Sequence, residues 1–178
     1  MTEERTYSPM QTVKRRFFAM RNGIIADTLR KAGSPFSIIF GLNLPQIADI
    51  AEMTGKDTTL AEQLWSNNTT RESMLLAPMI VEAESFTYDD ARRWVLSVPA
   101  LEVADILCHR LLRHLPFAWE LAEDLCGSDA PLAGYTALRL AFNLVATNPD
   151  RAIAIASNFT GHHLAEALKE EALFLKGG

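Results

Sequence analysis

The chain has few cysteines, the residues whose disulfides stabilise small extracellular folds. It contains 2 cysteines in 178 residues, which is too few for a disulfide framework, and its 9 glycines exclude a collagen-like repeat. No apolar run approaches the roughly 20 residues that cross a bilayer. Residues 1–10 carry two glutamates and lack the apolar segment of a secretion signal. We therefore expect a cytoplasmic protein in which Cys108 and Cys126 are reduced thiols.

Positive charge is also scarce. The 17 Lys and Arg residues stand against 22 Asp and Glu residues, and the net charge of −5 argues against a protein whose whole surface grips nucleic acid. The distribution is uneven. Residues 1–56 hold eight basic and five acidic side chains, a net charge of +3, whereas the rest holds nine and 17, a net charge of −8. A basic N-terminal third favours a polyanion or an acidic partner, and it is equally typical of a solvated helix face.

Strand patterns are absent as well. No segment alternates β-branched and polar residues, and the best candidate, residues 36–40, is short enough to be helix or loop. Helix-start residues recur instead, such as Ser8 before Pro9, and Asp57 and Thr87 before amphipathic segments. The expected helices span about 10–32 (with Gly23 as a division point), 44–52, 58–65, 70–84, 88–96, 100–115, 116–126, 131–146, 149–159 and 162–175. Pro78 falls inside one of them and must kink or break it.

About ten short helices with short connectors are typical of an α-solenoid of HEAT type, whose repeats have a degenerate period of about 40 residues. We expect an all-α, HEAT-like superhelix forming a single domain over residues 1–178, with residues 1–9 as the segment most prone to disorder. Such folds bind partners on their concave inner helices. A plain helical bundle is the alternative.

The segment at residues 60–77, LAEQLWSNNTTRESMLLA, resembles the HEAT-like-repeat glycosylases of DNA alkylation repair. Residues 40–45 and Ile50-Ala51 fit the same family pattern, and residues 103–105 and 138–144 fit it more loosely. The resemblance extends over about residues 13–147. It implies a curved solenoid whose positively charged concave face grips DNA. It also implies excision of N-alkylated purines by an Asp, with aromatic side chains stacking near the lesion and an Arg nearby.

The resemblance carries over unevenly to single residues. The family Asp matches Asp105, which the resemblance thereby marks as the catalytic residue. The aromatic one turn earlier falls on Leu101, and the family Arg falls near Ala137, with Arg139 two residues away. The chain therefore keeps one of these three motif positions.

Asp105 also stands out on physical grounds. It lies four residues after Leu101 and three before Cys108, within the apolar stripe of the expected helix 100–115. A carboxylate there must be paired, hydrogen-bonded or facing a cavity, because an isolated buried charge is costly. It could stabilise the positive sugar that develops when an alkylated base departs. Alternatively, it is a structural Asp that caps a neighbouring helix or pairs with an Arg across the repeat.

Candidate DNA contacts lie on two stretches. Guanidinium groups suit phosphate oxygens, and helical spacing can align several of them on one side. The predicted contacts are Lys14, Arg15, Arg16, Arg21, Arg30 and Lys31, together with Arg139 and Asn143 on a polar ridge that also includes Tyr135 and Thr136. An exposed helix face without a ligand explains the same spacing.

Metal and cofactor patterns are missing. The histidines beside Cys108 and at 162–163 do not have zinc-ligand spacing, and there is no glycine-rich phosphate loop. We predict no metal, no cofactor and no membrane partner. The favoured function is a DNA-binding protein of the alkylation-repair type, with Asp105 as the residue for any glycosylase activity. The alternative is a non-enzymatic scaffold that binds a protein or peptide.

Overall fold

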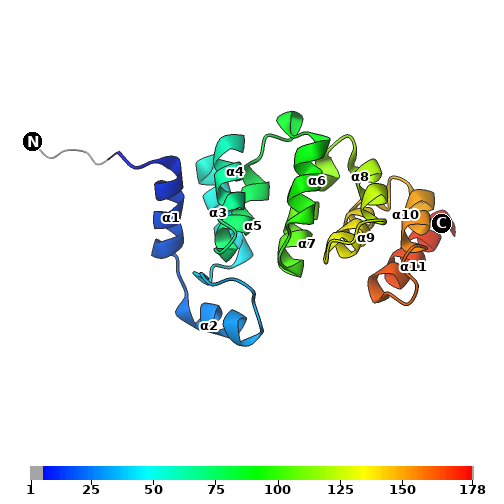
Figure 1. Cartoon of the computed structure of the whole chain (residues 1–178), viewed down its shortest axis with the longest axis horizontal. Coiled ribbons are helices and arrows are strands. Elements are labelled where there is room, and N and C mark those ends of the chain that lie inside the picture. The colour runs from blue at the N-terminus through cyan, green and yellow to red at the C-terminus, as the bar shows by residue number, and fades with distance from the viewer. Residues whose placement is uncertain (1–5, 178) are drawn as a thin grey trace, which may run out of the picture. The chain divides into compact units, whose positions relative to one another are not determined.

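Eleven α-helices and two 3-10 turns make up the regular structure of residues 6–177, the part of the chain that the computed structural model describes (Figure 1). Within those residues the only strand-like pairing is an isolated bridge between Ile38 and Thr70. The expected all-α class is confirmed. Residues 1–5, part of the segment expected to be prone to disorder, lie outside the described residues.

The chain divides into two compact units, residues 1–82 and residues 83–178. The first unit contains α1 (Pro9–Ala19), α2 (Gly23–Lys31), α3 (Leu44–Thr54), α4 (Thr58–Ser66) and α5 (Arg71–Ile80). The second contains η1 (Ala83–Ser85), α6 (Tyr88–Leu96), α7 (Leu101–Arg110), η2 (Leu112–His114), α8 (Ala118–Leu125), α9 (Ala133–Leu144), α10 (Pro149–Ala156) and α11 (His163–Gly177).

Side-chain caps explain most helix starts. Ser8, Asn43 and Thr87 each form a capping box, in which the cap side chain and the third helical residue satisfy each other's backbone N–H. Asp57 and Asn148 accept one N–H each at the starts of α4 and α10. These helices begin where the cap residues predict, because the first turn of a helix leaves its N–H groups without internal partners.

Two long expected helices are each broken. The segment 10–32 is interrupted before Gly23, where the Asn22 side chain accepts the N–H groups of Ile24 and Ile25 and starts α2. The segment 100–115 is α7 followed by η2, because Leu111 leaves the helical region with φ −129° and ψ −64°. The predicted continuous helix was wrong there.

Helix α5 is the centre of the first unit. All ten of its residues are buried, and it packs against α3 and α4. Pro78 lies inside it, and the helix ends at Ile80, earlier than the predicted residue 84. The terminal carbonyls find partners in the linker before α4, since Lys56 Nζ donates to Met79 O and the Asp57 N–H donates to Ile80 O.

A buried carboxylate fixes the loop between α2 and α3. Glu72 is fully buried and accepts the backbone N–H groups of Phe40, Gly41 and Leu42 at 3.0, 2.9 and 3.3 Å. Arg71 Nη1 donates both to Glu72 Oε1 and to Leu42 O, at 3.0 Å each. The Arg-Glu pair that carries part of the family resemblance therefore has a structural role, which is to hold this loop against α5.

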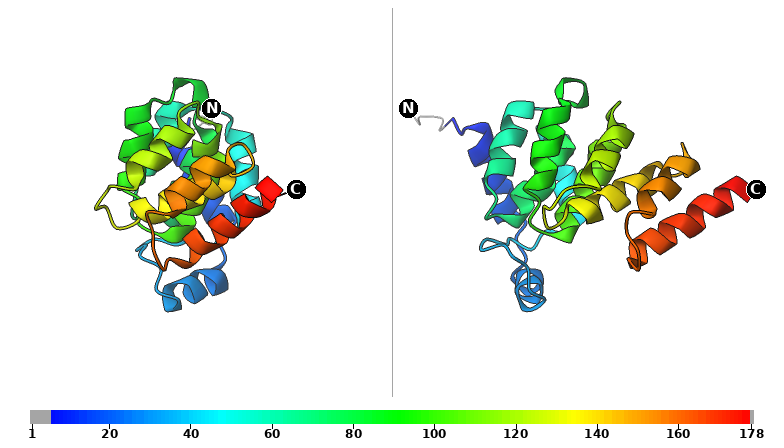
Figure 2. Two further views of the ribbon diagram at one scale, coloured as in Figure 1. Left: turned by 90° about the vertical axis from the view of Figure 1, so that its right-hand side faces the viewer. Right: turned by 45° about the vertical axis from the view of Figure 1, so that its right-hand side comes forward.

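Helix α9 is the centre of the second unit. It contacts α6, α7, α8, α10 and α11, and it buries Ala133, Ala137 and Leu138 completely. Helices α10 and α11 lie side by side (Figure 2). Ion pairs join neighbouring helices at the surface, including Arg92 on α6 with Asp124 on α8 at 2.8 Å. This packing of α9 on α7 positions the site described next.

Candidate functional site

Asp105 lies on the second turn of α7 and is held from α9. Tyr135 Oη donates a hydrogen bond of 2.6 Å to Asp105 Oδ1, and Arg139 Nε lies 3.0 Å from the same oxygen. The aspartate side chain is 33% exposed. Both bonds use Oδ1, and among the described residues nothing donates to Oδ2. The carboxylate is thus anchored on one side and accessible to solvent.

The spacing of the two partners explains this arrangement. Tyr135 and Arg139 are four residues apart and therefore project from the same face of α9, the face that meets α7. Ala137, onto which the family Arg falls, is fully buried. Arg139 is the arginine that reaches Asp105, although it is two residues away from that position.

The rest of the predicted ridge on α9 behaves differently. Thr136 is fully buried, and its hydroxyl donates to Leu132 O within the helix. Asn143 is half-buried, and its Nδ2 is buried with no hydrogen-bond partner among the described residues. Only Tyr135 and Arg139 therefore form one polar group with Asp105.

Burial and charge tune the groups beside Asp105. Burial, followed by the hydrogen bond to Asp105, raises the pKa of Tyr135 to about 12, so the phenol is a protonated donor at neutral pH. Cys108, three residues after Asp105, is fully buried, and burial raises the pKa of its thiol. A protonated, inaccessible thiol is no nucleophile. Leu101, one turn before Asp105, is aliphatic and 51% exposed, and the aromatic side chain that contacts the carboxylate is Tyr135.

The six predicted basic contacts near the N-terminus lie in the first unit: on α1 (Lys14, Arg15 and Arg16), in the connection to α2 (Arg21) and on α2 (Arg30 and Lys31). All are exposed except Arg16, which is half-buried and donates to Thr54 Oγ1 at 3.3 Å. Arg15 stacks over the ring of Tyr7, and Arg21 stacks over that of Phe18. Arg30 pairs with Asp27 at 2.9 Å. The break between α1 and α2 separates these cations, so they do not follow one continuous helical line.

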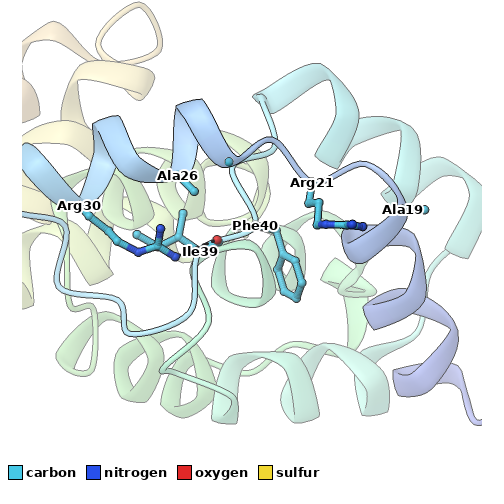
Figure 3. A pocket seen from close by; sticks show the side chains of 7 residues that line it. Ala19, Arg21, Ala26, Arg30, Ile39 and Phe40 are labelled. Carbon is cyan, nitrogen blue, oxygen red and sulfur yellow. Dashed lines mark hydrogen bonds between the residues drawn. The ribbon is translucent and has the colours of Figure 1, made fainter.

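Two of these arginines line a surface hollow of about 470 Å³ between α1, α2 and the loop that follows α2. Figure 3 shows Arg30 extending over Ile39 on one side, with Arg21 on the other side beyond Phe40. Arg30 Nη2 lies 3.5 Å from Ile39 O, and Arg21 donates to Phe18 O at 2.7 Å. The hollow therefore has a positive rim and an apolar floor.

Comparison with known proteins identifies the family. The family model for "DNA alkylation repair enzyme" matches residues 13–163, a range that contains every predicted site residue. The chain belongs to the DNA alkylation repair enzyme family. No curated protein matches it significantly.

A solved structure is similar to this family member over 93% of its length and 74% of the other chain, with a TM-score of 0.75 and 16% sequence identity. That protein is described as belonging to "a new family of proteins related to the HEAT-like repeat DNA glycosylases with affinity for branched DNA structures". At this identity the likeness shows the fold. It confirms the HEAT-like architecture that the sequence predicts for this member of the DNA alkylation repair enzyme family.

In residues 6–177 no three His, Cys, Asp or Glu side chains converge in a way that would hold a metal ion. None of the described helices combines the length and apolarity required to cross a membrane.

The hydrogen bond from Tyr135 to Asp105 was not predicted from the sequence. The i, i+4 spacing of Tyr135 and Arg139 is the signal that could have linked both residues to one partner.

Proposed function

We propose that this DNA alkylation repair family member binds DNA and that Asp105 acts on a damaged nucleotide. The observation that carries the catalytic part of the proposal is the anchored carboxylate of Asp105. Tyr135 and Arg139 both bind Oδ1, and Oδ2 has no partner among the described residues. A carboxylate held in one orientation, with one oxygen available, is suited to stabilising positive charge on a substrate.

The basic residues supply the DNA-binding part of the proposal. Exposed guanidinium and ammonium groups lower the free energy of binding to phosphates mainly by releasing counterions. The proposed contacts are Lys14, Arg15, Arg16, Arg21, Arg30 and Lys31 in the first unit, and Arg139 and Asn143 in the second. Asn143 requires rotation of its amide before it can donate to a phosphate, because its Nδ2 is buried.

The proposed reaction is hydrolysis of the glycosidic bond of an N-alkylated purine. The alkylated base is cationic, so it leaves with the bonding electron pair as a neutral purine and the sugar carbon becomes positive. Asp105 Oδ2 stabilises this positive sugar, and water then adds to the carbon and releases a proton.

We expect this reaction to be slow because of two features next to Asp105. Arg139 partly neutralises the carboxylate, and Leu101 provides no aromatic face one turn before it. Tyr135 supplies an aromatic ring, but its hydroxyl is bonded to Asp105. DNA binding is therefore the primary proposed activity, and base excision is secondary.

The test compares Asp105→Asn with Asp129→Asn, a change at an exposed aspartate of the same unit. Release of alkylated purine from duplex DNA should be lost in Asp105→Asn and retained in Asp129→Asn, with DNA binding retained in both. Release by Asp105→Asn at the wild-type rate would contradict the catalytic role. Absence of release by the wild-type protein would remove excision from the proposal and leave DNA binding.

A protein-binding scaffold is the second candidate, and one feature favours it. Leu173 and Phe174 on α11 are 59% and 76% exposed, which is unusual for adjacent large apolar side chains. Changing both to serine should abolish capture of a protein partner under this alternative. The same change should leave DNA affinity unaltered if the chain acts on DNA.

A further inference from the structure

Most cations of the second unit are neutralised by a carboxylate. Five of its eight Lys and Arg residues form ion pairs within the described part of the chain. The pairs are Arg92 with Asp124, Arg93 with Asp90, Arg139 with Asp105, Arg151 with Glu120 and Glu123, and Lys176 with Asp150. This unit carries thirteen acidic side chains, so an arginine without a carboxylate partner is unusual in it.

Arg110 and Arg113 are such an exception. Arg110 is exposed at the last position of α7, and Arg113 is half-buried on η2. In the described residues neither forms an ion pair. His109 and His114 flank them, both are exposed, and Arg113 Nε lies 3.2 Å from His114 Nε2. We call these four residues, His109, Arg110, Arg113 and His114, the α7-end cluster.

The positively charged side chains of this cluster lie close enough to His109 to affect its protonation. The pKa of this exposed imidazole is lowered, first by the partial loss of solvent around the ring and then by Arg113, Arg110, His114 and Arg139. The two guanidinium groups carry the permanent positive charges of the cluster. Positive potential that disfavours protonation of a nearby imidazole also attracts an anion.

Helix stability explains only part of the cluster. Cations in the last turn of a helix interact favourably with its C-terminal carbonyls, which accounts for Arg110. Arg113 lies beyond the end of α7 and has no such role. Arg113 therefore has neither a carboxylate partner among the described residues nor a helix-stabilising role, although its unit is rich in acidic side chains. This favours a ligand from outside the chain as its partner.

The position of the cluster indicates what that ligand is. His109 follows Asp105 by four residues and therefore lies on the same face of α7, with Arg110 next to it at the end of the helix. Arg139, which pairs with Asp105, is also among the charges that lower the His109 pKa. Guanidinium groups bind phosphate oxygens through two parallel hydrogen bonds. A phosphate bound here would hold the neighbouring sugar close to Asp105.

We propose that the α7-end cluster binds the phosphodiester backbone of DNA next to the Asp105 site. This inference rests on the proposed DNA-binding function and adds a contact surface in the second unit, separate from the basic residues of α1 and α2. The cluster orients DNA so that a nucleotide faces Asp105.

The test is the salt dependence of binding to fluorescent duplex and branched DNA. The Arg110→Gln/Arg113→Gln variant is compared with Arg92→Gln/Arg93→Gln, which removes the same charge from two arginines that have carboxylate partners. Loss of two phosphate contacts should make the slope of log K against log salt shallower by about 1.8. The control variant should keep the wild-type slope. Circular dichroism confirms that both variants are folded.

Each other outcome has a defined meaning. If the wild-type protein binds DNA and both variants share its slope, the cluster is not a contact and the inference fails, whereas the proposed function stands. If the wild-type protein binds no DNA at low salt, the proposed function itself fails. If poly-glutamate binds through Arg110 and Arg113 more tightly than DNA at equal ionic strength, the cluster serves an acidic protein, and the inference is again overturned.

Discussion

Replacing Glu72 with alanine should strongly destabilise the first unit. The carboxylate of Glu72 is fully buried and accepts three backbone N–H groups from residues 40–42. It also forms an ion pair with Arg71, whose own side chain is only 9% exposed. The substitution leaves all of these donors without the acceptor that they have in the wild-type protein.

The size of the effect follows from these contacts. Each buried donor that loses its partner costs about 1–3 kcal/mol, and removing one member of a buried ion pair costs about 3–5 kcal/mol. These terms overlap, and water entering the space left by Glu72 offsets part of them. We expect Glu72→Ala to lower the free energy of unfolding by about 4 kcal/mol, a large fraction of the total for a typical domain. Glu72→Gln should cost about half as much, because its amide oxygen still accepts hydrogen bonds.

Urea denaturation followed by circular dichroism measures both variants. Glu52→Ala, which removes an exposed glutamate from α3 in the same unit, is the matched control and should change stability by less than about 0.5 kcal/mol. A loss of less than about 1 kcal/mol in Glu72→Ala would show that Glu72 does not hold the loop.

Three further predictions concern other parts of the chain. In ultraviolet titration, Tyr135 should ionise near pH 12, and Asp105→Asn should lower that pKa only partly, because burial is the larger cause. This raised pKa contributes stability that is complete below about pH 10 and lost as the pH rises towards 12. Gly41→Ala should lower the melting temperature by several degrees, since φ is +82° and a Cβ would lie 2.1 Å from a backbone oxygen. A thiol reagent should modify half-buried Cys126 slowly and fully buried Cys108 only after denaturation; equal native rates would refute the assigned burial.

Local chemistry made much of the fold predictable. Ser8, Asn43 and Thr87 predict helix starts because their side chains accept hydrogen bonds from N–H groups within four residues along the chain. Interruptions that depend on distant residues were harder to predict. The early end of α5 near Pro78 relies on the linker before α4, whose donors satisfy its last carbonyls.

The candidate site was predictable in part for the same reason. A carboxylate in an apolar stripe requires a partner, which marked Asp105 from sequence alone. The identity of its partners depends on how α9 lies against α7, and this contact joins residues about thirty positions apart. Arg110 and Arg113 were not singled out, because their lack of carboxylate partners is visible only after the other arginines of the unit have been paired.

The central claim is that this family member binds DNA through phosphate contacts. The most direct measurement is the affinity of the wild-type protein for fluorescent duplex and branched DNA across a salt series. We predict binding that weakens with a linear negative slope of log K against log salt. No binding to either DNA at low salt, or binding that does not change with salt, would contradict it.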